Sequence, residues 1–231
     1  MGGLVASAWH LNWIGVMRPA RFAAAAASDH RLAAGLVRLA APLVDRMLSG
    51  RFQCAIPQPD DSITGHELTP AEFSEYLSDL TAEDSLTPIY DRHAAEWAWR
   101  RLEFLSPEDG VAQPTAVRGR RGNLLGWYCW KHSSDGIGRV QQIVARQANV
   151  GSVLDHLIRR AYDEGAAAIV GRLQPRMMQA FIDRNFHLKP RATYTLIHSK
   201  HAALLEHFRN GSAWLSAVDG EAPFNVWNRP Q

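Results

Sequence analysis

Arg146-Gln147-Ala148-Asn149-Val150-Gly151-Ser152 is the stretch that decides the fold, because it joins an expected strand to the most regular helix of the chain. The helix that follows has one apolar face at helical spacing, made of Val153, Leu154, Leu157, Ile158 and Ala161. Its first turn has backbone N–H groups without helical partners, and these groups and the helix dipole favour a bound anion. Gly151 is small, so the backbone there can approach a phosphate closely. The stretch therefore predicts an anion site where a strand turns into a helix.

Three antiparallel strands are expected before this stretch. Thr115 to Gly119 and Leu124 to His132 flank the turn Arg121-Gly122-Asn123. A second turn, Ser134-Asp135-Gly136, leads into a strand from Arg139 to Ala145. An Asp-Gly pair between two apolar runs is a strong hairpin signal. The pattern predicts an antiparallel meander.

A different alternation follows the long helix, whose C-terminal cap we expect at Gly165. Ala167 to Leu173 is a short apolar run, which is typical of a buried parallel strand. Pro175 opens a further helix that we expect to end at Asn185, and Ala192 to His198 reads as a last strand. A meander followed by strand, helix, strand, helix and strand predicts the fold class α/β (α+β) with one mixed sheet.

Shorter elements are expected between the N-terminal segment and the meander. Arg51 to Ile56 fits a strand, and residues 57–70 have the proline and glycine content of a linker. Thr69-Pro70-Ala71-Glu72 has the composition of a helix start, with an N-cap, a proline and an acid in the first turn. That helix should run through Leu80, and a second one from about Ile89 to Arg101.

Residues 1–50 are expected to form a helical arm that precedes a folded domain at 51–200 and a C-terminal extension at 201–231. The arm could be the remnant of an upstream domain. Its main helix begins near Arg31, with its apolar stripe at Leu32, Leu36, Leu39 and Leu43. The stripe either packs on a protein surface, which is the domain or a second copy in a homodimer, or lies on anionic lipid.

The composition excludes several classes of protein. The chain has 231 residues and a formal net charge of +2, which gives no reason to expect nucleic acid as a partner. Two cysteines, Cys54 and Cys129, exclude a disulfide framework and a four-cysteine zinc site, and we expect no metal. No stretch approaches the length of a transmembrane segment. We therefore expect a cytoplasmic protein, with peripheral attachment to a membrane left open.

The stretch from Arg146 to Ser152 resembles the cofactor loop of the GNAT superfamily of N-acetyltransferases, Gln/Arg-x-x-Gly-x-Gly/Ala. Arg146 and Gly151 match the pattern, and Asn149 replaces its first glycine. Asparagine is the residue other than glycine that best accepts a positive φ, so the turn can survive. The resemblance covers residues 114–200 well and 51–113 by element order. It implies that residues Arg146, Gln147, Ala148, Asn149, Val150, Gly151 and Ser152 hold the pyrophosphate of acetyl-CoA or another acyl-CoA.

A second likeness lies at the next helix, where many family members read Asn-x-x-Ala-x-x-x-Tyr-x-x-x-Gly-Phe. This chain has Gln174, Met177, Phe181, Asn185 and Phe186 at those positions. In many members the tyrosine protonates the departing thiolate of CoA, and Phe181 has no proton to give. The resemblance therefore implies a divergent bacterial member in which this role is absent or has moved.

The catalytic group remains open at this point. Tyr128, His132, Tyr194 and Cys129 are candidates by residue type, although a general acid or base is defined by its geometry first. The family polarises the thioester carbonyl with a backbone N–H group, which the resemblance implies near Ile143 or Val144.

The element Trp97-Ala98-Trp99-Arg100 also has a likeness. It resembles a Trp-Arg element of bacterial relatives close to the Fem-type and polysaccharide-linked acyltransferases. Its tryptophans either anchor a helix to the sheet or form an aromatic wall of an acceptor pocket.

Two functions remain as hypotheses. The first is an acyl-CoA-dependent N-acyltransferase that moves an acetyl or related acyl group to an amine of a small molecule or peptide. The second is a CoA-binding or interaction module that has kept the fold and lost the activity.

Overall fold

The computed structural model describes residues 2–5, 7–26, 53–80, 86–87, 91–104, 112–190 and 196–214. Its strands are β1 (Gly2–Val5), β2 (Leu11–Val16), β3 (Thr64–Glu67), β4 (Gln113–Arg118), β5 (Leu124–His132), β6 (Ile137–Ala145), β7 (Ala168–Arg172), β8 (His187–Pro190) and β9 (Leu196–Ser199). Its α-helices are α1 (Pro19–Ala26), α3 (Pro70–Leu80), α4 (Arg92–Phe104), α5 (Val150–Asp163), α6 (Met178–Ile182) and α7 (Ala202–Arg209). Short 3₁₀ helices are η1 (Ser7–His10), η3 (Gln147–Asn149) and η4 (Pro175–Met177).

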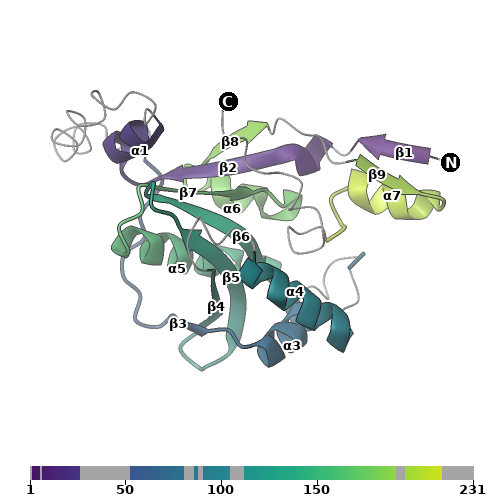
Figure 1. Cartoon of the computed structure of the whole chain (residues 1–231), viewed down its shortest axis with the longest axis horizontal. Coiled ribbons are helices and arrows are strands. Elements are labelled where there is room, and N and C mark those ends of the chain that lie inside the picture. Colours follow the sequence, from purple (N-terminus) through teal and green to yellow (C-terminus); the bar gives the residue numbers. More distant parts are fainter. Residues whose placement is uncertain are drawn as a thin grey trace.

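The main sheet has seven strands in the order β3-β4-β5-β6-β7-β2-β8 (Figure 1). All neighbouring pairs are antiparallel except β6 and β7, which are parallel. The predicted meander is β4-β5-β6, and β7 is the predicted buried strand after the long helix. The mixed α/β fold class is therefore confirmed.

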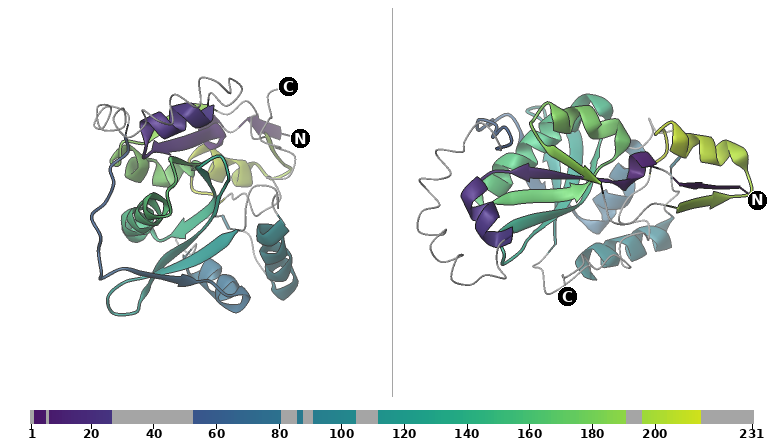
Figure 2. Two further views of the ribbon diagram at one scale, coloured as in Figure 1. Left: turned by 60° about the vertical axis from the view of Figure 1, so that its left-hand side comes forward. Right: turned by 90° about the horizontal axis from the view of Figure 1, so that it is seen from above.

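The sheet is covered by helices on both faces. The apolar stripe of α5 is buried on one face, where its predicted residues are all enclosed. The pair α3 and α4 lies on the opposite face, where Phe73 of α3 meets the ring of Trp127 edge-on at a centroid distance of 5.4 Å. Figure 2 shows that β1, β9 and α7 project beyond one end of the main sheet.

The N-terminal segment corrects the expectation of a separate arm. Strand β2, Leu11–Val16, is inserted between β7 and β8 and pairs with both. Its Trp13 is 1% exposed and belongs to the core. The helix expected from Arg31 to Leu48 lies outside the described residues, and the division of the chain at residues 50 and 200 stays a prediction.

Three further expectations on strands were wrong. Residues 53–56 have no regular structure, and β3 forms at Thr64–Glu67 within the expected linker. After α6, the strand that joins the main sheet is β8 at His187–Pro190. The strand expected from Ala192 to His198 is present at its C-terminal end, where β9 (Leu196–Ser199) forms, but β9 pairs with β1 in a sheet of two strands. Pairing between distant segments decides these positions, and local composition does not report it.

Several helix ends follow the sequence expectations. Thr69 and Glu72 form a reciprocal cap at the start of α3, in which Glu72 Oε2 accepts the Thr69 backbone N–H at 3.0 Å. This bond is the main cause that lowers the pKa of Glu72 to about 2. Gly165 and Asn185 have left-handed φ values of 89° and 57° after α5 and α6. Helix α6 itself ends at Ile182, three residues earlier than expected.

Candidate functional site

The parallel strands β6 and β7 separate before β6 ends. Their pairing covers only Ile137↔Ala168 to Val140↔Gly171. Beyond Val140, β6 continues to Ala145 with β5 as its hydrogen-bonded neighbour. The edge of β6 that faces away from β5 therefore has no β7 partner from residue 141 to residue 145, which leaves a gap between β6 and β7. We call this gap the splay.

A β-bulge marks the point where the splay opens. Cys129 lies opposite Gln142 and Trp130 lies opposite Val140, so Gln141 is one extra residue on β6. The thiol of Cys129 donates to Gln141 Oε1 at 3.3 Å. An extra residue bends its strand and increases the local twist, and bulges are common beside active sites. The bulge gives a physical reason for the separation of β6 from β7.

The expected anion loop begins directly after β6. Arg146 is extended and precedes η3, in which the Asn149 N–H donates to the Arg146 carbonyl at 2.8 Å. Asn149 has φ −108°, so it does not take the left-handed conformation expected of the first glycine. The 3₁₀ turn replaces that conformation, because its own backbone bond closes the loop. The guanidinium of Arg146 pairs with Asp79 of α3 at 2.6 Å.

Gly151 in the first turn of α5 has a structural partner. Arg184, which follows α6, donates through Nη2 to the Gly151 carbonyl at 3.0 Å and forms a two-bonded ion pair with Asp155. A Cβ at Gly151 would lie 3.0 Å from the same Nη2. Arg184 therefore fixes the first turn of α5 against α6. The small size of Gly151 suits this contact as well as a close phosphate.

Ile143 and Val144 lie on the backbone edge at the splay, and both are buried. Val150 is buried at the start of α5, Ser152 is half-buried, and Gln147 and Ala148 are exposed. The loop and the β6 edge are thus continuous in the structure. Whether they hold a cofactor stays a prediction.

Tyr128 points away from the α3 and α4 face. Its ring is buried under α5, and its hydroxyl lies 3.0 Å from His156 Nδ1. Burial raises the pKa of Tyr128 to about 12, and burial also lowers the pKa of His156. Arg160 donates to Thr115 Oγ1 at 2.6 Å and completes a polar network between α5 and the sheet. The network explains both side chains without a role in catalysis.

The other catalytic candidates are not brought together with Tyr128. The ring of His132 stacks on Trp130 at 5.8 Å. Cys129 is buried, and burial raises its pKa to about 12, so its thiol is held in the protonated form. Tyr194 lies outside the described residues.

Phe181 is buried within α6, as expected for the position aligned with the family tyrosine. Its ring stacks on Trp13 of β2 at a centroid distance of 4.7 Å and meets Phe186 edge-on at 5.2 Å. These contacts make Phe181 a member of the core that holds β2 in place.

Arg176 lies at the end of the splay. Its Nη2 donates to the carbonyl of Ala145, the last residue of β6, at 3.1 Å. Its guanidinium carbon lies 5.0 Å from the ring centroid of the buried Trp214. Arg176 thus occupies one of the two acceptor positions of the Ala145 carbonyl.

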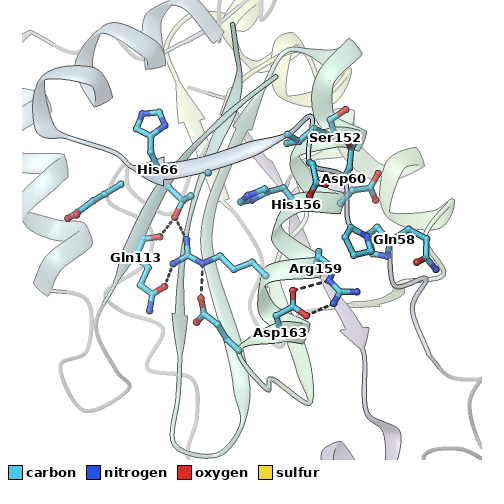
Figure 3. Close-up of a pocket in the computed structure, with 18 of the residues that line it drawn as sticks. Gln58, Asp60, His66, Gln113, Ser152, His156, Arg159 and Asp163 are labelled. Atoms are coloured by element: carbon cyan, nitrogen blue, oxygen red, sulfur yellow. Dashed lines mark hydrogen bonds and ion pairs between the residues drawn. The ribbon is translucent and has the colours of Figure 1, made fainter. Parts of the chain in front are cut away.

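A cavity of about 1000 Å³ lies elsewhere, between α5, β3 and residues 57–63 (Figure 3). Arg159 and Arg160 on its α5 wall are paired with Asp163 and Glu164. The lining includes Gln58, Asp60, His66, Gln113, Ser152 and His156. Apart from Ser152, it takes nothing from the predicted cofactor stretch.

No group of three or more His, Cys, Asp or Glu side chains suited to a metal ion occurs within the described ranges. In the same part of the chain, no helix combines the length and apolarity needed to cross a membrane.

Comparison with known proteins gives similarities of fold. No family model and no curated protein matches this chain. The solved structures similar to it include a GCN5-related N-acetyltransferase from Kribbella flavida at 14% identity, covering 66% of this chain and 56% of that one, with a TM-score of 0.38. Another, from Sphaerobacter thermophilus, has 12% identity, covers 84% and 52% of the two chains, and has a TM-score of 0.44.

A spermidine N-acetyltransferase mutant from Vibrio cholerae has 14% identity, covers 46% of this chain and 63% of that one, and has a TM-score of 0.33. The chain is thus similar to GNAT structures, the resemblance that the sequence predicts. It spans 56% and 52% of the first two neighbours. At these TM-scores the similarities say nothing about activity, which has to be argued from the site.

Proposed function

We propose that this chain is an acyl-CoA-dependent N-acyltransferase that moves an acetyl or related acyl group to an amine of a small molecule or peptide. The observation that carries the proposal is the splay of β6 and β7, with a bulge where it opens and the Arg146–Ser152 loop where β6 ends. Acyl-CoA enters as a co-substrate, and no metal is required.

The splay suits direct transfer of the acyl group from CoA to the amine, without a covalent enzyme intermediate. The pantetheine arm would pair with the backbone edge of β6, and the first turn of α5 would face the pyrophosphate. A neutral amine attacks the thioester carbon, the C–N bond forms and the C–S bond breaks. The amine loses one proton and the CoA thiolate gains one, so the step is balanced. Backbone N–H groups near the bulge are suited to the charge that develops on the thioester oxygen.

A substitution at Ser152 should change thermal stability and affinity for CoA in opposite directions. Ser152→Glu adds an acid to the first turn of α5, where it favours the helix dipole. The same carboxylate would repel a bound pyrophosphate. We expect unchanged or higher thermal stability and at least a tenfold weaker affinity for CoA in calorimetry.

Ser152→Gln is the matched control, because it has the same shape without the charge. It should bind CoA more tightly than the glutamate variant. With CoA at 100 times its dissociation constant, the wild-type protein should gain about 2.7 kcal/mol of unfolding free energy from the bound ligand. Equal affinity of the two variants for CoA would contradict the placement of the phosphates.

A CoA-binding module without activity is the second candidate. Phe181 favours it, because the position aligned with the family tyrosine is packed into the core and offers no proton. Release of free CoA thiol in the presence of amines distinguishes the two functions, since only the enzyme produces it. A cytoplasmic location and a homodimer stay predictions.

A further inference from the structure

Three buried polar atoms on β5 and β6 lack a hydrogen-bond partner among the described residues. They are Nε1 of Trp127 and Nε1 of Trp130 on β5, and Oε1 of Gln142 on β6. Trp127 and Gln142 carry the inference. Gln142 is 5% exposed and Trp127 is 0% exposed. Burying such groups unpaired is costly, so each one in a folded protein calls for an explanation.

These two side chains lie on the same face of the sheet. Gln142 is opposite Cys129 and Val144 is opposite Trp127 in the antiparallel pair. Residues opposite one another share a face, so Gln142 and Trp127 are diagonal neighbours. The ring of Trp127 packs on Phe73, which places both on the face covered by α3. An unpaired acceptor atom and an unpaired donor atom thus belong to diagonal neighbours on one face of the sheet.

Their position along the strand points to the splay. Gln142 follows the extra residue of the bulge and lies two residues beyond Val140, the last residue of β6 that pairs with β7. It is therefore on the part of β6 that the proposed thioester would reach. On the α5 face, Tyr128 has a partner in His156, whereas Nε1 of Trp130 is unpaired like Nε1 of Trp127. Only the α3 face combines an unpaired donor with an unpaired acceptor among these three atoms.

We propose that Gln142 and Trp127 position the acyl acceptor, and that the acceptor is an amine with an oxygen function close to its nitrogen. Gln142 Oε1 accepts an N–H of the amine, and Trp127 Nε1 donates to the neighbouring oxygen. Amino sugars and peptide N-termini have this pair of groups, whereas polyamines lack the oxygen. The inference rests on the proposed acyl transfer and deepens it.

The roles of the two residues are positional. A carboxamide does not titrate, so Gln142 does not remove the proton from the amine. By holding one N–H, it leaves the nitrogen lone pair free to form the bond to the thioester carbon. Phe73 and Trp99, which meet edge-on at 5.9 Å, extend the aromatic surroundings on this face. Trp99 thus packs α4 against α3, whereas its element was expected to anchor a helix to the sheet or to line an acceptor pocket.

The test compares three amines with acetyl-CoA: glucosamine, the dipeptide Ala-Ala and spermidine, with release of CoA thiol as the readout. Wild-type protein should use at least one oxygen-bearing amine with a kcat/KM at least tenfold above that for spermidine. Gln142→Leu and Trp127→Phe should each lower this kcat/KM at least tenfold. Gln142→Glu keeps an accepting oxygen and should retain more activity than the leucine variant.

Stability and cofactor affinity separate this role from a structural one. Gln142→Leu removes an unpaired buried group at nearly the same volume, so it should leave the unliganded protein equally stable or more stable. Trp127→Phe also removes an unpaired group, but its smaller ring leaves space in the core, so a modest loss of stability is expected there. Acetyl-CoA affinity in calorimetry should stay within twofold of wild type. Gln179→Leu, at an exposed position on α6, is the control and should change neither quantity.

Several results would overturn the inference. They are an unchanged kcat/KM in Gln142→Leu, a preference of the wild type for spermidine, or no turnover of the oxygen-bearing amines by protein that binds acetyl-CoA. Loss of stability in both variants would assign the two atoms to a structural buried water instead. Wild-type protein that does not bind acetyl-CoA would refute the proposed function itself, which distinguishes the two failures.

Discussion

Trp13→Ala tests the insertion of β2 into the sheet, where β2 pairs with β7 on one side and with β8 on the other. Trp13 is 1% exposed and stacks on Phe181 at 4.7 Å. Its indole Nε1 donates to the carbonyl of Arg172, the last residue of β7, at 2.9 Å. The ring also covers Gly171, where a Cβ would come within 2.4 Å of the indole. Any side chain at 171 would therefore push the indole away.

The magnitude follows from these contacts. Truncating a buried Trp to Ala costs about 3–5 kcal/mol of unfolding free energy, which includes the cavity that remains. Losing the hydrogen bond to Arg172 adds about 0.5–1.5 kcal/mol. The sum of about 3.5–6.5 kcal/mol is a large part of the 5–15 kcal/mol that typically stabilises a folded chain. Trp13→Phe keeps most of the packing and should cost about 1–2 kcal/mol.

Urea denaturation followed by far-UV circular dichroism measures this difference. Trp97→Ala is the matched control, because Trp97 on α4 is 48% exposed and the same truncation there should cost less than about 1 kcal/mol. A loss below about 1.5 kcal/mol for Trp13→Ala would refute the reasoning, since it would show that β2 does not hold β7 and α6 together.

Two further predictions concern side chains near the site and at the start of α3. Tyr128→Phe should lower stability by about 1 kcal/mol, because it breaks the bond to His156. It should leave kcat with any amine substrate within about twofold, and a loss of a hundredfold would show that Tyr128 takes part in catalysis. Glu72 has a folded-state pKa of about 2, below the unfolded value of about 4.3, so its contribution to stability is complete above about pH 4.3 and lost as the pH falls through about 2. Thermal melts should therefore show Glu72→Gln less stable than wild type at pH 6 and equal to it near pH 2, and a difference that does not depend on pH would contradict the role of the Thr69 cap.

Local patterns were enough for the elements around the predicted anion loop. The meander and the stripe of α5 follow from periodicity, because residues two or about 3.6 positions apart share a face. The caps at Gly165, Asn185 and Thr69 follow from backbone preferences of single residues. These features depend on neighbours within a few positions, which the sequence displays directly.

The features that shape the candidate site depend on distant partners. Gly151 meets Arg184, which is 33 residues away in the chain, and Arg146 pairs with Asp79, which is 67 residues away. A bulge such as that at Gln141 has no sequence signature, because either strand can accept the extra residue. Local patterns therefore indicated the turn from β6 into α5, whereas the separation of strands near Ile143 and Val144 was implied by the family resemblance and by no local pattern.

The sequence by itself determined the α5 helix, the meander that leads into it and the turn that joins them, since these are written in short-range spacing. Only the tertiary structure decided that Leu11–Val16 fills the sheet between β7 and β8, and that Gln142 and Trp127 lie unpaired on one face. Strand pairing and the satisfaction of buried polar groups involve residues that are far apart in the chain. Their outcome is set by which surfaces meet in the folded protein, and no local pattern records that.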